Sequence, residues 1–341
     1  MASPPESDML GSPMLLMLLA CSKTDPSATV PLYRYSHVGT FNQAGTHLFI
    51  SGGSGSGGKR LDSWRIALGV DGENTAEWEE LSAPPRDIFR STLVREPGTD
   101  MAWVFGGSQG DNSTESASLE RWNLADDSWT SLGETGPGGR YKADAVWDGS
   151  RMLLLGGRFD DNEETLTLDD LWGFDTDTET WTELSPTGGP GAITRSSMAL
   201  GEDGLVYLSG GIDADGNRYD WVWTLDPDTL EWNELEVGGE TPGNRASHSS
   251  HWYDGQLWVW AGSGQDNALW ALDPQAGTWR SFEGEAPLGR DAQVTSSPDG
   301  RHLFIMGGDP ADDEATPNFV NDVWEVDLDT QIWTERVAWG E

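Results

Sequence analysis

The chain has 341 residues, and its 20 lysines and arginines stand against 58 aspartates and glutamates, a formal net charge of −38. A field of that sign repels nucleic acid and anionic membrane surfaces, so neither is expected as a direct partner. The single cysteine excludes an internal disulfide and any metal site built from several cysteines.

The first predicted element is an export signal. Residues 14–20 read MLLMLLA and run directly into Cys21. This apolar run is too short to span a bilayer but is long enough for the core of a signal peptide. The string LLAC at residues 18–21 resembles a bacterial lipobox, in which a lipid is attached to the cysteine. Residues 1–13 depart from that pattern, since they carry no lysine or arginine.

We therefore expect residues 1–20 to be a lipoprotein-type signal peptide, Cys21 to be lipidated, and residues 21–30 to form a short tether. Such a protein would sit in the periplasm or at the cell surface, anchored to a membrane without spanning it. The alternative is a leader segment with a free thiol.

Residues 31–341 contain one unit repeated six times. Each unit carries a glycine pair followed by two tryptophan motifs, and the closing tryptophans of successive units lie 47 to 54 residues apart. The glycine steps are Gly52-Gly53, Gly106-Gly107, Gly156-Gly157, Gly210-Gly211, Ala261-Gly262 and Gly307-Gly308. The closing tryptophans are Trp78, Trp129, Trp181, Trp232, Trp279 and Trp333.

The third unit shows the predicted strands. Short apolar or alternating runs occupy residues 143–147, 151–155, 171–174 and 180–184, and glycine, aspartate and asparagine separate them. Four strands in every repeat predict an all-β fold, a six-bladed β-propeller of four-stranded antiparallel blades. We expect each blade to be one continuous segment, with the ring closed by packing between the first and last blades.

The motifs resemble those of the kelch-repeat family. The matching features are the glycine pair at the end of the second strand, an aromatic-x-apolar-Asp element such as Trp172 to Asp175, and a tryptophan in the fourth strand. An arginine also opens each unit. The resemblance covers residues 31 to 337 and implies a kelch-type propeller, in which the glycines and tryptophans serve packing between blades.

The arginines are the candidate ligand-binding residues. Innermost strands of a propeller begin around the central channel, where several guanidinium groups could hold a carboxylate or phosphate. In kelch-type substrate adaptors, equivalent arginines bind acidic motifs, so the resemblance points the same way. The alternative is that acidic residues of the protein itself pair with them. The six arginines are Arg34, Arg86, Arg140, Arg195, Arg245 and Arg290.

No catalytic set is apparent. His248 and His251 are three residues apart, so on a strand they point to opposite faces. His37 and His248 each lie three residues after a repeat arginine, which favours a structural hydrogen bond. Asp213-x-Asp215-x-Asn217 begins like a calcium loop, but its glycine comes at the fourth place and the acid at the twelfth is missing. We expect no metal and no cofactor.

The sequence thus favours an exported, lipid-anchored kelch propeller that binds a protein or carbohydrate ligand without catalysis, with an anionic group at the channel mouth. Two alternatives remain open. One is an isomerase acting on an acidic sugar in the channel, because sialic-acid mutarotases are also six-bladed kelch proteins. The other is an envelope scaffold.

Overall fold

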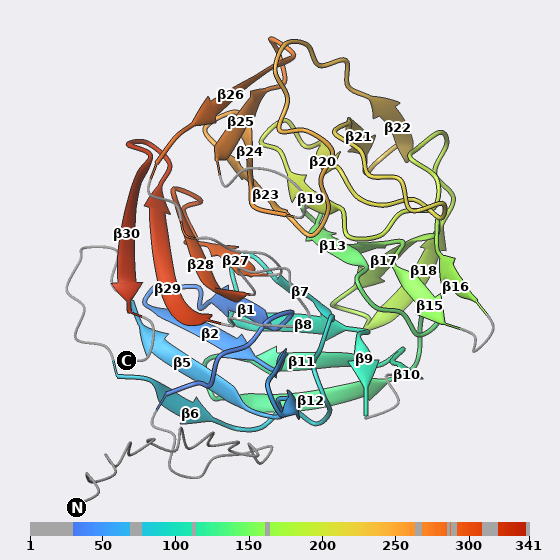
Figure 1. The fold of residues 1–341 in the computed structure, drawn as a ribbon. Coiled ribbons are helices and arrows are strands. Elements are labelled where there is room, and N and C mark those ends of the chain that lie inside the picture. Colours follow the sequence, from blue (N-terminus) through green and yellow to red (C-terminus); the bar gives the residue numbers. More distant parts are fainter. Residues whose placement is uncertain are drawn as a thin grey trace, which may run out of the picture.

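The structure is a computed structural model that describes residues 30–68, 77–110, 114–160, 164–262, 268–284, 287, 292–308 and 320–338. In these ranges every regular element is a strand, and six four-stranded sheets surround one axis (Figure 1). The predicted all-β, six-bladed propeller of four-stranded antiparallel blades is confirmed. None of the described elements is a helix of the length and apolarity that crossing a bilayer requires. The predicted signal peptide, residues 1–20, and Cys21 lie outside the described residues.

Each blade is a continuous segment of chain, as predicted. The strands of blades 1 to 3 are β1 (Val38–Phe41), β2 (His47–Ser51), β5 (Ser63–Ala67) and β6 (Glu79–Leu81); β7 (Thr92–Arg95), β8 (Met101–Phe105), β11 (Leu119–Asn123) and β12 (Ser128–Gly133); β13 (Asp144–Trp147), β14 (Met152–Leu155), β17 (Leu171–Asp175) and β18 (Thr180–Leu184). Those of blades 4 to 6 are β19 (Ser197–Leu200), β20 (Val206–Ser209), β21 (Val222–Asp226) and β22 (Glu231–Glu234); β23 (Ser249–Tyr253), β24 (Gln256–Trp260), β25 (Leu269–Asp273) and β26 (Thr278–Phe282); β27 (Gln293–Ser296), β28 (His302–Gly308), β29 (Val320–Asp327) and β30 (Ile332–Val337).

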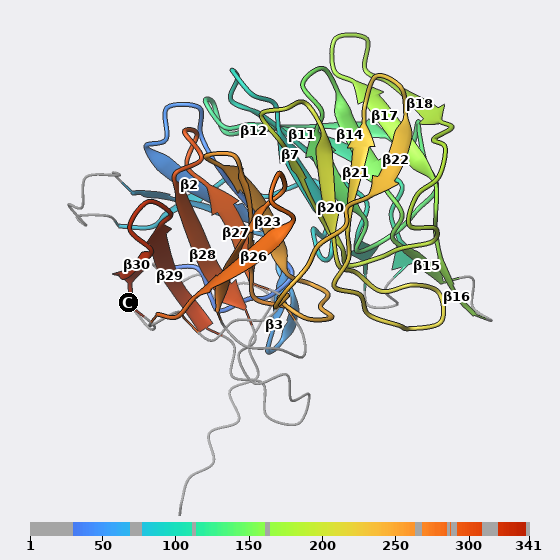
Figure 2. The same cartoon turned by 90° about the horizontal axis from the view of Figure 1, so that it is seen from above.

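Three small hairpins follow the glycine pairs of the first three blades. They are β3 (Ser54–Gly55) with β4 (Gly58–Lys59), β9 (Ser108–Gln109) with β10 (Thr114–Glu115), and β15 (Arg158–Asp160) with β16 (Thr165–Thr167). Figure 2 shows β3, β15 and β16 on one side of the disc. The chain just before the first inner strands lies on this same side, because Tyr35 bridges to Ser54 and Tyr141 bridges to Arg158.

Neighbouring blades bury the inner strands of a blade more fully than its outermost strand, and the hydrophobic pattern of the sequence reflects this difference. All four residues of β14 are buried, so this second strand is a continuous apolar run. The outer strand β22 alternates instead, with Trp232 buried between the exposed Glu231 and Asn233. Period-two patterning therefore marks the rim of the disc, and unbroken apolar runs mark its interior.

The repeat tryptophans fill the spaces between blades. In blade 2, the rings of Trp122 and Trp129 stack with centroids 4.6 Å apart. Trp122 also meets Phe49 of blade 1 edge-on at 5.6 Å. Between blades 5 and 6, the centroids of Trp260 and Trp333 are 5.7 Å apart. The large rings thus occupy the gaps that open as the twisted sheets diverge outward.

The glycine pairs lie where the backbone of the next blade approaches most closely. Gly52 and Gly53 have φ of 72° and 87°, in the left-handed region. A Cβ atom on Gly52 would overlap the carbonyl oxygen of Ile88, which belongs to the segment leading into blade 2. Both the conformation and the contact therefore require glycine at this position.

Among the strands that the structure describes, blade 6 closes against blade 1 without exchanging one. The rings of Phe41 and Phe304 are 4.6 Å apart in a hydrophobic cluster shared by the two blades. The Asn321 side-chain amide donates to the carbonyl of Pro31 at 3.2 Å, and the Gly308 N–H donates to the carbonyl of Arg34 at 3.0 Å. Closure by packing between the first and last blades matches the prediction.

Replacing Gly52 with alanine is expected to reduce the free energy of unfolding by about 3 kcal/mol or more, because strain and a backbone overlap act together. Gly98 is the matched control: its φ is 81°, but a Cβ there meets nothing within 4 Å. Gly98→Ala should cost only about 1 kcal/mol. Denaturant unfolding of the two variants measures the difference, and equal losses would refute the close-approach explanation.

Candidate functional site

Arg34 is fully buried and bound within its own blade. Its Nη1 and Nη2 atoms donate to the two carboxylate oxygens of Asp62 at 2.8 and 2.9 Å, and Nη1 also donates to the Gly52 carbonyl at 3.0 Å. Burial alone would raise the pKa of Asp62, but the charge and hydrogen bonds of Arg34 hold that pKa below its ordinary value. This bidentate pair ties the segment before β1 to the segment before β5.

Arg140 and Arg86 make comparable ties in blades 3 and 2. Arg140 binds both oxygens of Asp170, at 2.5 and 2.8 Å. The Arg86 Nε atom donates to Glu120 at 3.1 Å. Breaking a buried ion pair by removing one partner typically costs about 3–5 kcal/mol, so these side chains have a clear structural role.

Arg245 is also buried, but it binds carbonyl groups. The residue two places before the third-strand tryptophan is acidic in blades 1 to 3 and is Ala268 in blade 5. Arg245 donates instead to the carbonyl of Pro242 and, at 3.0 Å, to that of Ala261. The backbone at Ala261, where the second strand of blade 5 ends, therefore helps to hold the Arg245 side chain in place.

Arg195 occupies a different register. In blade 4 the place of Arg34 is taken by Ile193, and Arg195 follows two residues later. Arg195 lines a cavity at the mouth of the central channel. Arg290 lies outside the described residues. The structure thus revises the predicted convergence of arginines: it brings Arg195 to the mouth, and it holds the other four inside their blades, namely Arg34, Arg86, Arg140 and Arg245.

A ring of backbone hydrogen bonds surrounds the mouth. Within the described residues four N–H groups, those of Arg90, Lys142, Arg195 and Ser247, each donate to the carbonyl of the equivalent residue in the preceding blade, over distances of 2.9 to 3.2 Å. These four residues and Ser36 have a positive φ between 49° and 59°. The ring members are Ser36, Arg90, Lys142, Arg195 and Ser247. Non-glycine residues in this conformation are uncommon, and they gather at ligand-binding sites.

Three of these ring residues are cationic. Arg90, Lys142 and Arg195 line a cavity of about 150 Å³ together with Ser91, Ser196 and the residues beside them. The Arg90 guanidinium lies over the ring of Phe89 at 4.8 Å and over that of Tyr141 at 5.5 Å. Three positive side chains in one concavity are notable because the whole chain has only 20 lysines and arginines. We refer to these three residues as the cationic mouth.

The sequence prediction missed Arg90 and Lys142. Of the repeat arginines, Arg195 alone among the described ones has the register of the mouth. The other lining positions lie two residues after Arg34, Arg140 and Arg245, and four residues after Arg86. The three cations of the mouth share one position in the repeat: Arg90, Lys142 and Arg195 each lie two residues before the first strand of their blade. This shared position is hard to recognise in the sequence because Arg86 lies six residues before the first strand of its blade, whereas Arg34 lies four residues before its own.

Two histidines next to the ring are buried and neutral. Burial, and then the nearby Arg34, lower the pKa of His37 to about 3; burial and then Arg245 do the same for His248. His248 Nε2 is 2.7 Å from the Ser209 hydroxyl, the structural bond that its position predicts. His37 differs, since neither ring nitrogen has a hydrogen-bond partner among the described residues.

His248 and His251 do not converge. His248 faces Ser209 of blade 4, whereas His251 Nε2 lies 3.1 Å from the Gly300 carbonyl of blade 6. The two rings therefore belong to opposite junctions of blade 5. This is the divergence that strand geometry predicts for residues three apart.

The acidic loop after Gly211 is bonded internally. Asp213 accepts hydrogen bonds from the N–H groups of Asp215 and Asn217 and from the Tyr219 hydroxyl. These bonds, with that from Tyr219 foremost, lower the pKa of Asp213 to about 2. Among the described residues no group of three or more histidine, cysteine or acidic side chains is arranged to hold a metal ion.

The fold and the repeat define a kelch propeller, and comparison with known sequences agrees. The profile of the KLHDC2/KLHL20/DRC7 kelch-repeats domain matches residues 16–200 and 145–340. Together the two matches cover most of the chain, which therefore belongs to the kelch-repeat family.

Several characterised proteins resemble the chain at low identity. The leucine-zipper-like transcriptional regulator 1 homolog of Drosophila melanogaster is 28% identical over 252 residues, which is 69% of this chain and 25% of that protein. Human kelch domain-containing protein 3 is 29% identical over 41% of this chain and 39% of its own length. N-(sulfonatooxy)prop-2-enimidothioate sulfolyase of Thlaspi arvense is 26% identical over 56% of this chain and 62% of its own. The chain thus spans well under half the length of the first two.

Replacing His37 with leucine is expected to make stability less dependent on pH. Above the ordinary pKa of 6.5 the ring is neutral in both states; as the pH falls from 6.5 towards about 3, the unfolded chain takes up a proton that the native protein excludes. The native state therefore loses stability on acidification, by about 2 kcal/mol for this ring at pH 5. Unfolding free energies of the wild type and His37→Leu, compared at pH 7.5 and pH 5, measure the effect.

The more exposed His47 provides the control, and His47→Leu should change the pH dependence less. Asp144, whose burial raises its pKa to about 8, titrates in the opposite sense in every variant and cancels from the comparison. An unchanged pH dependence in His37→Leu would contradict the buried neutral ring.

Proposed function

We propose that this kelch propeller is a non-catalytic binding module whose cationic mouth receives an anionic group of a protein or glycan partner. The observation that carries the proposal is the placement of Arg90, Lys142 and Arg195 around one cavity. In a chain of net charge −38 most of the surface repels anions. A local cluster of cations therefore directs an anionic ligand to this one site.

The size of the cavity favours a projecting group of a larger partner. Sites that enclose a whole small-molecule ligand usually measure about 300–1,000 Å³, and the mouth cavity measures about 150 Å³. A carboxylate-bearing side chain or a terminal acidic sugar fits that volume, and the hairpins on the same side provide further surface for the rest of the partner. This supports binding over the isomerase alternative, in which the channel would enclose an entire acidic sugar.

The kelch relatives include proteins whose names denote interaction, such as the zebrafish Rab9 effector protein with kelch motifs, 28% identical over 54% of this chain and 52% of its own length. A protein partner is therefore our first choice and a glycan the second. An envelope scaffold would need only the disc and its tether, and the cationic mouth gives no particular support to it.

The export hypothesis rests on the apolar run at residues 14–20 and on Cys21. We propose a protein of the periplasm or cell surface, with residues 1–20 removed, a lipid on Cys21, and residues 21–30 as the tether to the propeller. The membrane is then a point of attachment rather than a ligand.

Binding at the mouth is tested with the purified propeller and three single variants, Arg90→Gln, Lys142→Gln and Arg195→Gln. A library of peptides rich in glutamate or aspartate and a panel of sialylated glycans serve as probes. Each variant is expected to weaken binding of an anionic probe by tenfold or more, and binding should weaken as salt is raised. Arg121→Gln on the outer part of blade 2 is the control. Binding that these three variants leave unchanged would overturn the proposal, and catalysed anomerisation of free sialic acid would replace it with the isomerase.

Lipid attachment is tested separately in cells. Radiolabelled palmitate is expected to label the native protein and not Cys21→Ala, and the variant should leave the membrane fraction. A native protein that stays unlabelled and fractionates like Cys21→Ala would contradict the anchor without bearing on the cationic mouth.

A further inference from the structure

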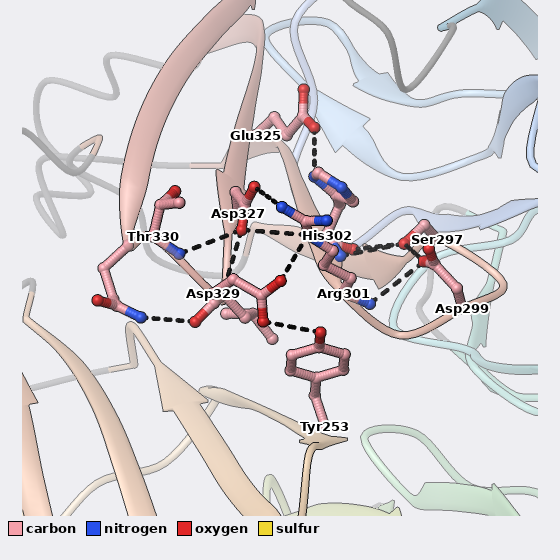
Figure 3. A network of polar contacts seen from close by, with 11 residues as sticks. Tyr253, Ser297, Asp299, Arg301, His302, Glu325, Asp327, Asp329 and Thr330 are labelled. Atoms are coloured by element: carbon pink, nitrogen blue, oxygen red, sulfur yellow. Dashed lines mark hydrogen bonds and ion pairs between the residues drawn. The ribbon is translucent and has the colours of Figure 1, made fainter.

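Within the described residues, Arg90 lacks the carboxylate partner that several other arginines of this acidic chain have. Arg301, for example, binds Asp327 at 2.7 Å and Asp329 at 3.0 Å (Figure 3). For the Arg90 guanidinium, by contrast, the described part of the chain provides no hydrogen-bond acceptor, and its Nε atom is buried. A charged group that is partly removed from water without a counter-ion is costly, so an anion from outside that reaches it offsets that cost.

Two aromatic rings fix the direction of this guanidinium. Its central carbon lies 4.8 Å from the ring centroid of Phe89 and 5.5 Å from that of Tyr141. Both aromatic residues are buried, and the Tyr141 hydroxyl is 3.3 Å from a carboxylate oxygen of Asp160. A guanidinium that lies over aromatic faces keeps its in-plane N–H groups for an oxyanion.

Three serine hydroxyls at the mouth make no hydrogen bond within the described part of the chain. They belong to Ser36 of blade 1, Ser196 of blade 4 and Ser247 of blade 5, and all three residues line the same cavity as the cationic mouth. Together with the three cations, they place hydrogen-bond donors on five consecutive blades around this cavity. Donors that surround a cavity suit a tetrahedral phosphate, whose oxygens point in several directions, better than a planar carboxylate.

The charge of the mouth favours a dianion. Of the described residues that line the cavity, three are cationic and none is acidic. Arg290 and Asp291, which lie outside the described residues, carry opposite charges. A carboxylate would balance one of the three positive charges, whereas a phosphate monoester carries a charge of about −1.5 to −2 at pH 7. The phosphate therefore gains more from this site than the carboxylate does.

The volume of the cavity also agrees with a phosphate group. An apolar cavity of about 150 Å³ in another protein holds a benzene molecule, and the mouth cavity measures about 150 Å³. A phosphate group has one heavy atom fewer than benzene, so the cavity accommodates it but leaves the rest of the ligand outside.

We propose that the anionic group received by the cationic mouth is a phosphate monoester, presented by a protein partner as phosphoserine or phosphothreonine. This inference rests on the proposed function and narrows its ligand class. The phosphate oxygens accept from Arg90, Lys142 and Arg195, and the serine hydroxyls around the cavity donate to the remaining lone pairs.

The test compares three degenerate peptide pools that differ only in a fixed central residue, which is phosphoserine, glutamate or serine. Fluorescence anisotropy at pH 7.0 measures their binding to the whole chain. We expect the phosphoserine pool to bind at least tenfold more tightly than the glutamate pool, and the serine pool to show no measurable binding. Ser196→Ala and Ser247→Ala should each weaken binding of the phosphoserine pool by threefold or more. Ser281→Ala, at an exposed position on the outer strand β26, is the matched control and should bind as the wild type does.

The pH dependence distinguishes the two anions. The second pKa of a phosphate monoester is about 6, so lowering the pH from 7.0 to 5.0 should weaken binding of the phosphoserine pool by about tenfold and that of the glutamate pool by less than twofold. The mouth keeps its own charge over this range, because burial lowers the pKa of His37 and of His248 to about 3 and raises that of Asp144 to about 8. Circular dichroism at pH 5.0 checks that the fold is retained.

Equal affinities for the phosphoserine and glutamate pools, or phosphoserine binding that is unchanged at pH 5.0, would overturn this inference. The proposed function would still stand in that case, provided that Arg90→Gln weakens binding of both pools. Competition with free phosphoserine and glucose 6-phosphate identifies the source of the phosphate: displacement of the pool at lower concentrations of glucose 6-phosphate would replace the protein partner with a phosphorylated sugar. No binding of any pool would contradict both this inference and the proposed protein partner.

Discussion

The whole molecule depends on the way twisted sheets fit around an axis. Adjacent blades must nearly touch at the channel and diverge towards the rim, so the space between them changes with radius. Glycine pairs such as Gly52-Gly53 meet the first requirement, because backbone can pass directly against the next blade. Tryptophans such as Trp122 and Trp260 meet the second, because their rings span a wide gap. The other residues of each repeat lie between the close contact at the channel and the wide gap at the rim.

The same constraint creates the ring at the channel mouth. Where blades come closest, their backbones bond to one another in sequence, and each junction residue is forced into the left-handed region. A side chain at such a position projects from a tightly held backbone. Arg90, Lys142 and Arg195 are therefore positioned by the architecture itself, while Arg34 and Arg140, two places earlier, are used to tie strands together within blades.

The fold could be predicted from the sequence because its signals are periodic and local. Glycine pairs and tryptophans recur at nearly constant spacing, and a repeat reports its own boundaries. The site was harder. An arginine that opens a unit looks the same whether it binds Asp62 or faces a channel, and the acidic partner that decides between these roles lies 28 residues away in the chain. Only the three-dimensional register distinguishes Arg34 from Arg195. The hydrogen bond from the Tyr253 hydroxyl to Asp329 joins blades 5 and 6 across 76 residues of chain, and no local sequence signal marks it.

Closure without strand exchange has a topological consequence. Because each blade is built from one uninterrupted segment, none of the six blade sheets in the described part of the chain contains strands from both ends of the propeller. The junction between blades 6 and 1 is held by side-chain packing and a few hydrogen bonds, as junctions elsewhere in the ring are. The ring therefore has no privileged starting point: a circular permutant opened at another inter-blade loop, with blades 1 and 6 joined by a linker, would assemble the same six sheets in the same order around the axis.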